Sequence, residues 1–274
     1  MHTLHLLPAS QLKNYILNMP SLSYSLLAIS GVPLVNPGDD LTTIILDSLT
    51  KNNIALDDND VLVVAQKIVS KAEGQLVNLD EVSPGPEALK LAEDIDKDPR
   101  LVELVLSESV RIVRTKPGVL VVEHHSGIVM ANAGIDHSNV NDAQDAAYVT
   151  LLPRDANKSA KELCEALSNS TGKKIAVIIN DSVGRPWRKG TVGIAIGSAG
   201  ITPLVDLRGN KDLFGNVLQV SETADADSLA SAACLLMGEG ADASPLVLIR
   251  GHTLVENNED TRVLIRDAEN DMFR

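Results

Sequence analysis

The chain has 274 residues and a formal net charge of -13, and only 2% of its residues are aromatic. This length supports a substantial hydrophobic core in one large domain or two closely joined lobes. The acidic charge and the scarcity of aromatic rings argue against a nucleic-acid-binding protein. No stretch approaches the roughly 18 apolar residues of a membrane span, and the first residues lack a signal-peptide pattern. We therefore expect a soluble, cytoplasmic protein without a membrane partner.

Alternating helices and strands are predicted along the first half of the chain. The apolar runs predict strands at 26–29, 61–65, 119–123 and 128–131, and helices at 41–49, 86–95 and 99–113. The strand at 61–65 would deliver Gln66, Lys67, Ser70, Lys71 and Glu73 to its exit. The two later strands are expected to pair around Ser126 and Gly127, and Asp136 would end a strand.

The second half continues the same alternation. Helices are predicted at 156–170 and 225–237, and strands at 175–179 and 246–249. The hairpin and the glycine-rich stretch 193–200 argue against an all-parallel sheet, and no repeat or linker divides the chain. The expected fold class is therefore mixed α/β or α+β, with mixed sheets flanked by helices.

The usual nucleotide-binding motifs are absent from the sequence. Gly193, Gly197 and Gly200 do not form a dinucleotide-binding pattern, and we expect them to serve close packing or turns. The segment 172–174 lacks the upstream glycine and the following hydroxyl of a P-loop. The fold is therefore expected to be neither a Rossmann domain nor a P-loop domain.

The cysteines and the histidine pair do not predict a metal or redox site. Cys164 and Cys234 lie in apolar, helix-like surroundings without a metal-binding or redox spacing, so we expect buried thiols. His124 and His125 are adjacent, and neighbours on a strand point to opposite faces. This pair is expected not to share one metal ion.

The most informative segment joins a buried strand to a basic turn. Its apolar, β-branched run predicts a strand covered on both faces, ending where Asn180 and Asp181 emerge. Arg185, Arg188 and Lys189 follow in the turn. A positive cluster in so acidic a chain indicates an anionic ligand.

Three carboxylates are candidate metal ligands: Asp136, Asp181 and Glu239 each follow an apolar element and lie in a glycine-containing turn. Such hard oxygen ligands suit Mg2+ or Mn2+ ions that also contact substrate phosphates. The alternative for each one alone is a turn or helix cap. Lys71 could neutralise phosphate, as could Arg208 and Lys211, although those two could equally form a solvated basic face beside Asp206 and Asp212.

Five ordered blocks of sequence carry a specific resemblance. They lie at 30–34, 70–74, 132–139, 181–185 and 236–242. With these blocks, the chain resembles the coenzyme F420-0:L-glutamate ligase family, also called the gamma-glutamyl ligase family, from about Ile29 to Gly251. The resemblance implies a ligase domain at 23–274 with a fold of its own, preceded by an N-terminal extension at 1–22.

The activity implied by the resemblance is GTP-dependent amide ligation. L-glutamate would be joined to coenzyme F420-0, a deazaflavin acceptor, through an acyl phosphate, with release of GDP and phosphate. Two Mg2+ or Mn2+ ions and K+ would assist, and the protein would be a homodimer. The alternatives are a ligase for another carboxylate acceptor, a two-metal phosphohydrolase, or a catalytically silent nucleotide- or metal-binding protein.

The resemblance also implies roles for individual residues. Asp136 and Asp181 would hold one metal ion, and Ser182 and Glu239 a second. For the chemical step itself, our own hypothesis is that Lys71 and Arg185 or Arg188 offset charge on the reacting groups. The implied GTP contacts are Ser30, Gly31, Val32, Pro33, Gln66, Lys67, Lys71, Asn139, Met237, Gly238, Glu239, Gly240, Ala241, Asp242, Ala243 and Ser244. The chain departs from the family pattern at Ser182, where threonine is usual, and at Gln66 and Lys67, which replace a small hydroxyl-bearing pair.

Overall fold

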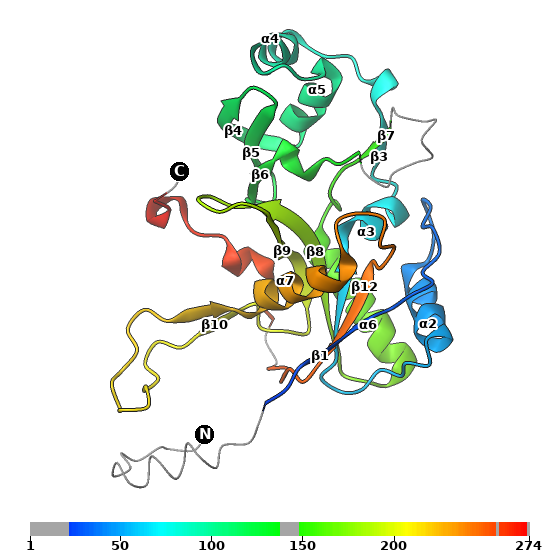
Figure 1. The fold of residues 1–274 in the computed structure, drawn as a ribbon, viewed down its shortest axis with the longest axis vertical. Helices are drawn as coiled ribbons and strands as arrows, with labels where there is room; N and C mark the ends of the chain where they lie inside the picture. The colour runs from blue at the N-terminus through cyan, green and yellow to red at the C-terminus, as the bar shows by residue number, and fades with distance from the viewer. Residues whose placement is uncertain (1–21, 138–147, 256–257, 273–274) are drawn as a thin grey trace.

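The fold is built around one five-stranded mixed sheet (Figure 1). The computed structural model describes residues 22–137, 148–255 and 258–272. The strand order is β1-β12-β2-β8-β9, in which β2 and β8 are parallel and the other neighbours are antiparallel. The strands are β1 (Ser25–Ala28), β2 (Val61–Ala65), β8 (Ala176–Gly184), β9 (Thr191–Ala199) and β12 (Leu246–Arg250). The expected mixed α/β class is confirmed.

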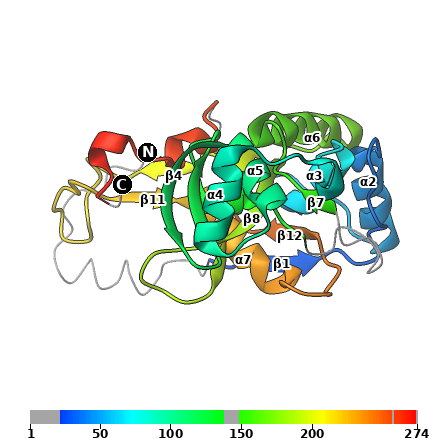
Figure 2. The same cartoon turned by 90° about the horizontal axis from the view of Figure 1, so that it is seen from above.

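Helices cover both faces of this sheet, as Figure 2 shows from above. One face packs against α2 (Leu41–Lys51), α3 (Gln66–Ala72) and α6 (Ala156–Thr171), and the other against α7 (Asp225–Met237). Because side chains alternate along a strand, Leu62 and Val64 enter the first core cluster while Val61 and Val63 enter the second. This two-sided burial explains the continuous apolar runs of the central strands.

A separate lobe lies beyond one end of the sheet, at the top of Figure 1. It contains α4 (Pro86–Ile95), α5 (Pro99–Ser107), β4 (Ser109–Lys116), β5 (Val119–His124) and β6 (Val129–Ala131), with its own apolar cluster. The short strands β3 (Leu76–Asn78) and β7 (Tyr148–Thr150) pair between the lobe and the sheet. The antiparallel pairing of β5 with β6 confirms the predicted hairpin.

An arm and a C-terminal segment complete the described chain. The arm consists of β10 (Leu204–Asp206), β11 (Glu222–Ala224) and the loop between them, and it projects from the sheet in Figure 1. The short 3₁₀ helices are η1 (Leu79–Glu81), η2 (Asn132–Gly134), η3 (Thr261–Leu264) and η4 (Ala268–Asn270). Among the described residues, no helix is both long and apolar enough to cross a lipid bilayer.

Two predicted boundaries are wrong. The helix predicted over 99–113 ends at Ser107, where the chain turns into β4 and pairs with β5. Val110, expected on the buried stripe of that helix, is instead exposed on β4. The strand expected to end at Asn180 and Asp181 continues as β8 to Gly184, because it pairs with β9 through the whole hairpin.

The glycine-rich stretch forms β9, and two of its glycines allow helices to approach closely. A Cβ atom on Gly193 would lie 2.5 Å from the Ala230 carbonyl oxygen, and one on Gly197 would lie 2.2 Å from that of Ala156. Those carbonyls belong to α7 and α6, which cover opposite faces of the sheet. The prediction of packing glycines is confirmed, whereas the strand itself was missed because glycine is unfavourable within strands.

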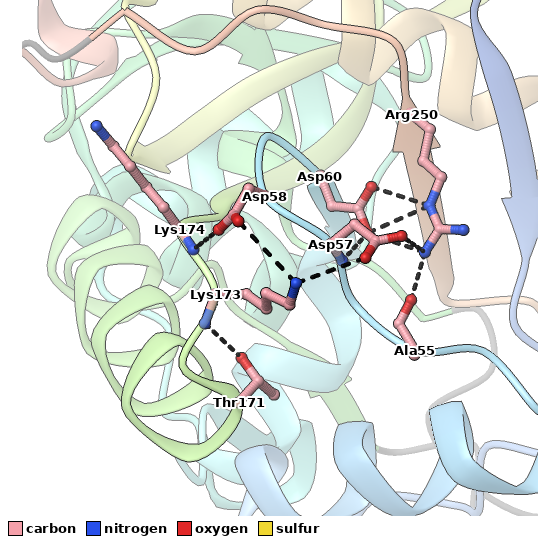
Figure 3. Close-up of polar contacts among 8 residues, drawn as sticks. All are labelled: Ala55, Asp57, Asp58, Asp60, Thr171, Lys173, Lys174 and Arg250. Carbon is pink, nitrogen blue, oxygen red and sulfur yellow. Dashed lines mark hydrogen bonds and ion pairs between the residues drawn. The ribbon is translucent and has the colours of Figure 1, made fainter.

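An ion-pair network links two strands of the sheet at the end opposite the lobe (Figure 3). Arg250 Nε lies 3.0 Å from Asp60 Oδ1, and Arg250 also donates to the Ala55 carbonyl oxygen. Asp60 is only 2% exposed, and its Oδ2 accepts a 2.8 Å hydrogen bond from the Asp57 N–H. Arg250 lies at the end of β12 and Asp60 just before β2, so the network joins two neighbouring strands.

Candidate functional site

A cleft of about 400 Å³ lies where β2 ends and β8 continues. β2 runs parallel to β8 and stops opposite Asn180, so the next residues of β8 are left beside the start of α3. Crevices at the carboxyl ends of parallel strands are common ligand sites. The lining residues lie at 32–35, 65–68, 71, 136, 180–182, 234, 237–241 and 243–245.

Two lysines enter the cleft from α3, which begins directly after β2. Lys67 and Lys71 are four residues apart and therefore lie on the same side of the helix. Lys67 Nζ is 2.8 Å from Asp136 Oδ2. Burial and the neighbouring charge of Lys67 lower the pKa of Lys71. The two lysines were predicted at the exit of the strand, and the structure places them there within helix α3.

Asp136 reaches the cleft from an irregular turn after β6. The expectation that Asp136 ends a strand is wrong, since β6 ends at Ala131 and η2 intervenes. Asn132, Ala133 and Gly134 all have positive φ angles of 51°, 54° and 73°. A Cβ atom on Gly134 would lie 2.7 Å from the Leu152 side chain, so the turn requires glycine there. An isolated antiparallel bridge to Thr150 then fixes Asp136.

Asp181 is enclosed by protein and close to other acids. Burial raises the pKa of Asp181 to about 7, and the charges of Asp136 and Glu239 act in the same direction. A backbone hydrogen bond from Ser182 and the charge of Lys67 oppose this increase. A cation beside Asp181 would favour its charged form, since opposite charge lowers a carboxyl pKa.

Ser182 and Glu239 form a second pair of oxygen-bearing side chains in the cleft. Ser182 Oγ donates a 3.0 Å hydrogen bond to Glu239 Oε2, and Thr191 Oγ1 donates a 3.3 Å bond to Glu239 Oε1. Adjacent residues of a strand point to opposite faces, so Asp181 and Ser182 diverge from β8. Asp136 and Asp181 therefore gather on one side of β8, and Ser182 and Glu239 on the other. Sequence patterns missed Thr191, because its contact arises only from the β8–β9 hairpin.

Most residues of the implied nucleotide site line this one cleft. They are Val32, Pro33, Gln66, Lys67, Lys71, Met237, Gly238, Glu239, Gly240, Ala241, Ala243 and Ser244. The Gln66 amide is buried and donates to Ser70 Oγ and to the Leu151 carbonyl oxygen. Asn139 lies outside the described residues.

Three other implied nucleotide contacts are not among the lining residues. Ser30 Oγ donates a 2.8 Å hydrogen bond to Asn52 Oδ1, and Gly31 follows with a φ of 69°. Asp242 Oδ2 accepts a hydrogen bond from the Gly240 N–H, within the loop that follows α7. All three belong to segments that contribute neighbouring residues to the cleft.

The cations of the basic turn lie outside the cleft lining. Arg185 Nη1 donates a 3.3 Å hydrogen bond to the Gly190 carbonyl oxygen, across the base of the β8–β9 turn. Arg188 and Lys189 are exposed in that turn. Arg208 forms ion pairs with Asp206 and Glu222 on the arm, as its surface alternative predicted.

The oxygen atoms of the cleft could hold divalent ions as two pairs rather than as one cluster. In the described part of the chain, no three His, Cys, Asp or Glu side chains gather around a single possible ion. Each pair offers hard oxygen donors and leaves most of an octahedral shell for water and phosphate, the arrangement that Mg2+ favours.

The adjacent histidines lie outside this cleft. His124 bonds Ser126 Oγ and His125 bonds the Ser107 carbonyl oxygen, so the two rings have different partners.

Oxygen pairs, lysines and a glycine-containing loop in one cleft are features of a site for an anionic, phosphate-bearing substrate. The fold is neither a Rossmann nor a P-loop domain, and the cleft at the end of its central sheet is of the kind that enzymes use as a substrate site. The chain belongs to the F420-0:Gamma-glutamyl ligase family, whose model matches residues 31–251. It is therefore a member of a ligase family.

Relatives from methanogens support this assignment over nearly the whole chain. A protein of Methanothermobacter thermautotrophicus is 44% identical over 255 residues, covering 92% of this chain and 100% of the relative. A Methanopyrus kandleri protein is also 44% identical, covering 90% of this chain and 98% of its own. A Methanocaldococcus jannaschii protein is 42% identical, with coverages of 80% and 86%. All three are named Coenzyme F420:L-glutamate ligase.

Proposed function

We propose that this protein is a GTP-dependent ligase that forms a gamma-glutamyl-type amide bond between L-glutamate and coenzyme F420-0. The observation that carries the proposal is the convergence in one cleft of two oxygen pairs, Asp136 with Asp181 and Ser182 with Glu239, beside Lys67 and Lys71. The ligase family and the names of its relatives supply the reaction.

The residues of the cleft suit activation of a carboxylate by phosphoryl transfer. The acceptor carboxylate would attack the γ-phosphorus of GTP, the bond to the bridging oxygen would break, and GDP would leave. The amine of glutamate would then attack the acyl carbon, and phosphate would leave as the amide forms. Catalysis of this kind rests mainly on positioning and on stabilisation of negative charge.

Two Mg2+ or Mn2+ ions, when bound, would act as Lewis acids that neutralise negative charge during phosphoryl transfer. Asp136 and Asp181 would hold one ion and Ser182 and Glu239 the other. Lys67 Nζ lies 2.8 Å from Asp136 Oδ2, so its positive charge would also lie beside the substrate phosphates. Lys71 lies in the same cleft and would stabilise the transferring phosphoryl group.

The cations of the basic turn would add positive charge around the reacting groups. Arg185 and Arg188 follow Ser182 on the same hairpin, and Thr191 on its returning strand contacts Glu239. A small movement of this turn would bring its cations toward an anionic substrate bound at the two oxygen pairs. We retain Lys71, Arg185 and Arg188 as the proposed catalytic cations.

The direct test combines the protein with GTP, L-glutamate, Mn2+ and the lactyl-phosphodiester deazaflavin, followed by mass spectrometry. The expected product is heavier than the acceptor by one glutamyl residue, and one GDP forms per amide bond. Omission of glutamate should suppress GDP release. Release of phosphate that does not depend on glutamate would instead indicate the phosphohydrolase alternative, and product formation with another carboxylate would indicate a different acceptor.

Replacement of one carboxylate tests the metal assignment. Asp181→Asn should lower glutamylation at least about 100-fold and weaken Mn2+ binding measured by calorimetry, because the amide supplies no charge to the ion. Asp47→Asn, on the exposed side of α2, is the matched control and should leave both quantities unchanged. Wild-type values of both quantities in Asp181→Asn would remove Asp181 from the metal site.

Three expectations remain proposals alongside the activity. The use of K+ and the cytoplasmic location rest on the family resemblance and on the sequence. Homodimer formation has some support from exposed apolar side chains on the β10–β11 arm, including Phe214 and Val220. We also keep the expectation that nucleic acid is not a partner.

A further inference from the structure

A second cavity, of about 500 Å³, lies beside the β9 edge of the central sheet. Its walls come from the β5–β6 turn, the residues before and at the start of α6, β9, and the C-terminal segment that includes η3. Figure 1 shows this C-terminal segment, in red, next to β9 and below the lobe. This cavity is a different space from the cleft described above.

The two cavities are lined by neighbouring residues of the β8–β9 ladder. Asp181, which lines the cleft, pairs directly with Ile194, which lines the second cavity. Residues directly opposite in an antiparallel pair share a face, with Cβ atoms about 5 Å apart. The second cavity therefore begins one side chain away from the proposed site of phosphoryl transfer.

Much of the wall of this cavity is apolar. Ile128, Leu152, Ile194 and Ile265 contribute hydrocarbon from four separate segments. Leu152 belongs to the main core cluster, and Ile194 packs against that cluster. Packing in the core therefore fixes the positions of these two side chains. Such a surface suits a flat, partly apolar molecule, and the volume lies within the usual range of about 300–1,000 Å³ for ligand pockets.

Two arginines of the cavity wall are placed to meet an anionic ligand. Arg154 and Arg266 line it, and neither guanidinium has a hydrogen bond or ion pair within the described parts of the chain. Two acidic groups of the wall accept hydrogen bonds within the protein, Asp155 from the Lys158 N–H and Asp227 from the Ala195 N–H. Asp271 also interacts within the protein, and Arg262 is paired with Asp260.

We propose that this second cavity binds the acceptor substrate, a molecule with a planar, partly apolar ring and an anionic chain. Its ring lies against Ile128, Leu152 and Ile265, and its anionic groups meet Arg154 and Arg266. Its reacting carboxylate then passes Ile194 to reach Asp181. The cavity is larger than a single amino acid requires, which favours the acceptor over L-glutamate. This inference rests on the proposed ligase function and assigns the acceptor to a site distinct from the nucleotide cleft.

Arginine replacement tests the assignment. Arg154→Met and Arg266→Met keep an extended side chain and remove the charge, and Arg114→Met on exposed β4 is the matched control outside both cavities. Each cavity variant should raise the KM for the deazaflavin acceptor about tenfold, as expected for loss of one charged hydrogen bond. The KM for GTP and the unfolding temperature should match those of wild type and of Arg114→Met.

Direct binding separates failure of this inference from failure of the proposed function. Equilibrium dialysis of the acceptor without GTP should give a weaker Kd for both cavity variants than for the control. If wild type turns over but both variants keep the control's acceptor KM and Kd, the acceptor site lies elsewhere. A rise in the KM for GTP alone would also overturn the assignment. If wild type binds the acceptor through these arginines but forms no amide bond, the cavity stands and the ligase function fails.

Discussion

The side chain of Asp181 is enclosed by protein and lies near two other acids, Asp136 and Glu239. Burial is the largest cause that raises its pKa from 3.8 to about 7. Between those two values the folded protein binds more protons than the unfolded chain. The contribution of Asp181 to the free energy of unfolding must therefore fall as pH rises from about 4 to about 7, and it is constant above that range.

The substitution Asp181→Asn should remove this dependence. Without metal ions, the variant should be more stable than wild type at pH 8, by about 2–4 kcal/mol, and nearly equal to wild type at pH 4. Urea unfolding in a chelator across this pH range measures the difference. Asp47→Asn should show no gain that increases with pH. A constant difference between Asp181→Asn and wild type at every pH would contradict the raised pKa.

At this scale, sequence reasoning identified the acids of the cleft better than their surroundings. Asp136, Asp181 and Glu239 were recognisable because each is an acid that follows an apolar element beside glycine. The ion pair of Lys67 with Asp136 and the hydrogen bond of Thr191 to Glu239 were not predictable. Both contacts depend on backbone paths, a helix directly after β2 and a complete β8–β9 hairpin, that local patterns do not reveal.

At the scale of elements, β12 and the start of β2 are joined by the ion-pair network of Arg250 and Asp60. Asp60 is almost fully buried, whereas Lys173 makes longer contacts of 3.6 and 4.0 Å with Asp57 and Asp58 at the surface. Removal of one partner from a buried pair leaves an uncompensated charge, which costs about 3–5 kcal/mol. Exposed pairs contribute about 1 kcal/mol or less.

Arg250→Met should therefore destabilise the protein by about 3 kcal/mol or more, and Lys173→Met by less than about 1 kcal/mol. Chemical denaturation of both variants under the same conditions measures the two losses. Comparable losses for the two substitutions would mean that the Asp60 carboxylate finds other partners. The charge of Arg250 was not assigned a role from sequence, since Asp60 is 190 residues away along the chain.

The elements that the sequence predicts correctly are those with clear local signals at their ends. The helix over 86–95 begins with proline, and the helix over 225–237 is followed by Gly238, and both were predicted with the correct bounds. The segment 109–113 was assigned to a helix because its apolar spacing continued that of α5. Pairing with β5 decides its conformation, and that pairing is a tertiary contact.

At the scale of the whole molecule, the β10–β11 arm extends away from the compact sheet (Figure 1). Its loop exposes large apolar side chains, with Phe214 76% and Val220 84% exposed, and Leu213 and Val217 are also exposed. Apolar groups gathered on a projecting surface commonly mark protein interfaces. The overall fold class was predictable from alternating elements, but this arm was not, since its strands have three residues each.

If the proposed homodimer uses this arm, replacement of its apolar side chains should separate the subunits. Phe214→Ser combined with Val220→Ser should shift the mass in light scattering after gel filtration from about two chains toward one, because buried apolar area drives such association. Gln219→Ser, an exposed polar change on the same loop, should leave the mass unchanged. A monomeric wild type would reject the dimer itself. A dimer that persists in the double variant with an unaltered dissociation constant would place its interface on another surface, because loss of two such side chains should weaken an interface that contains them by at least about tenfold.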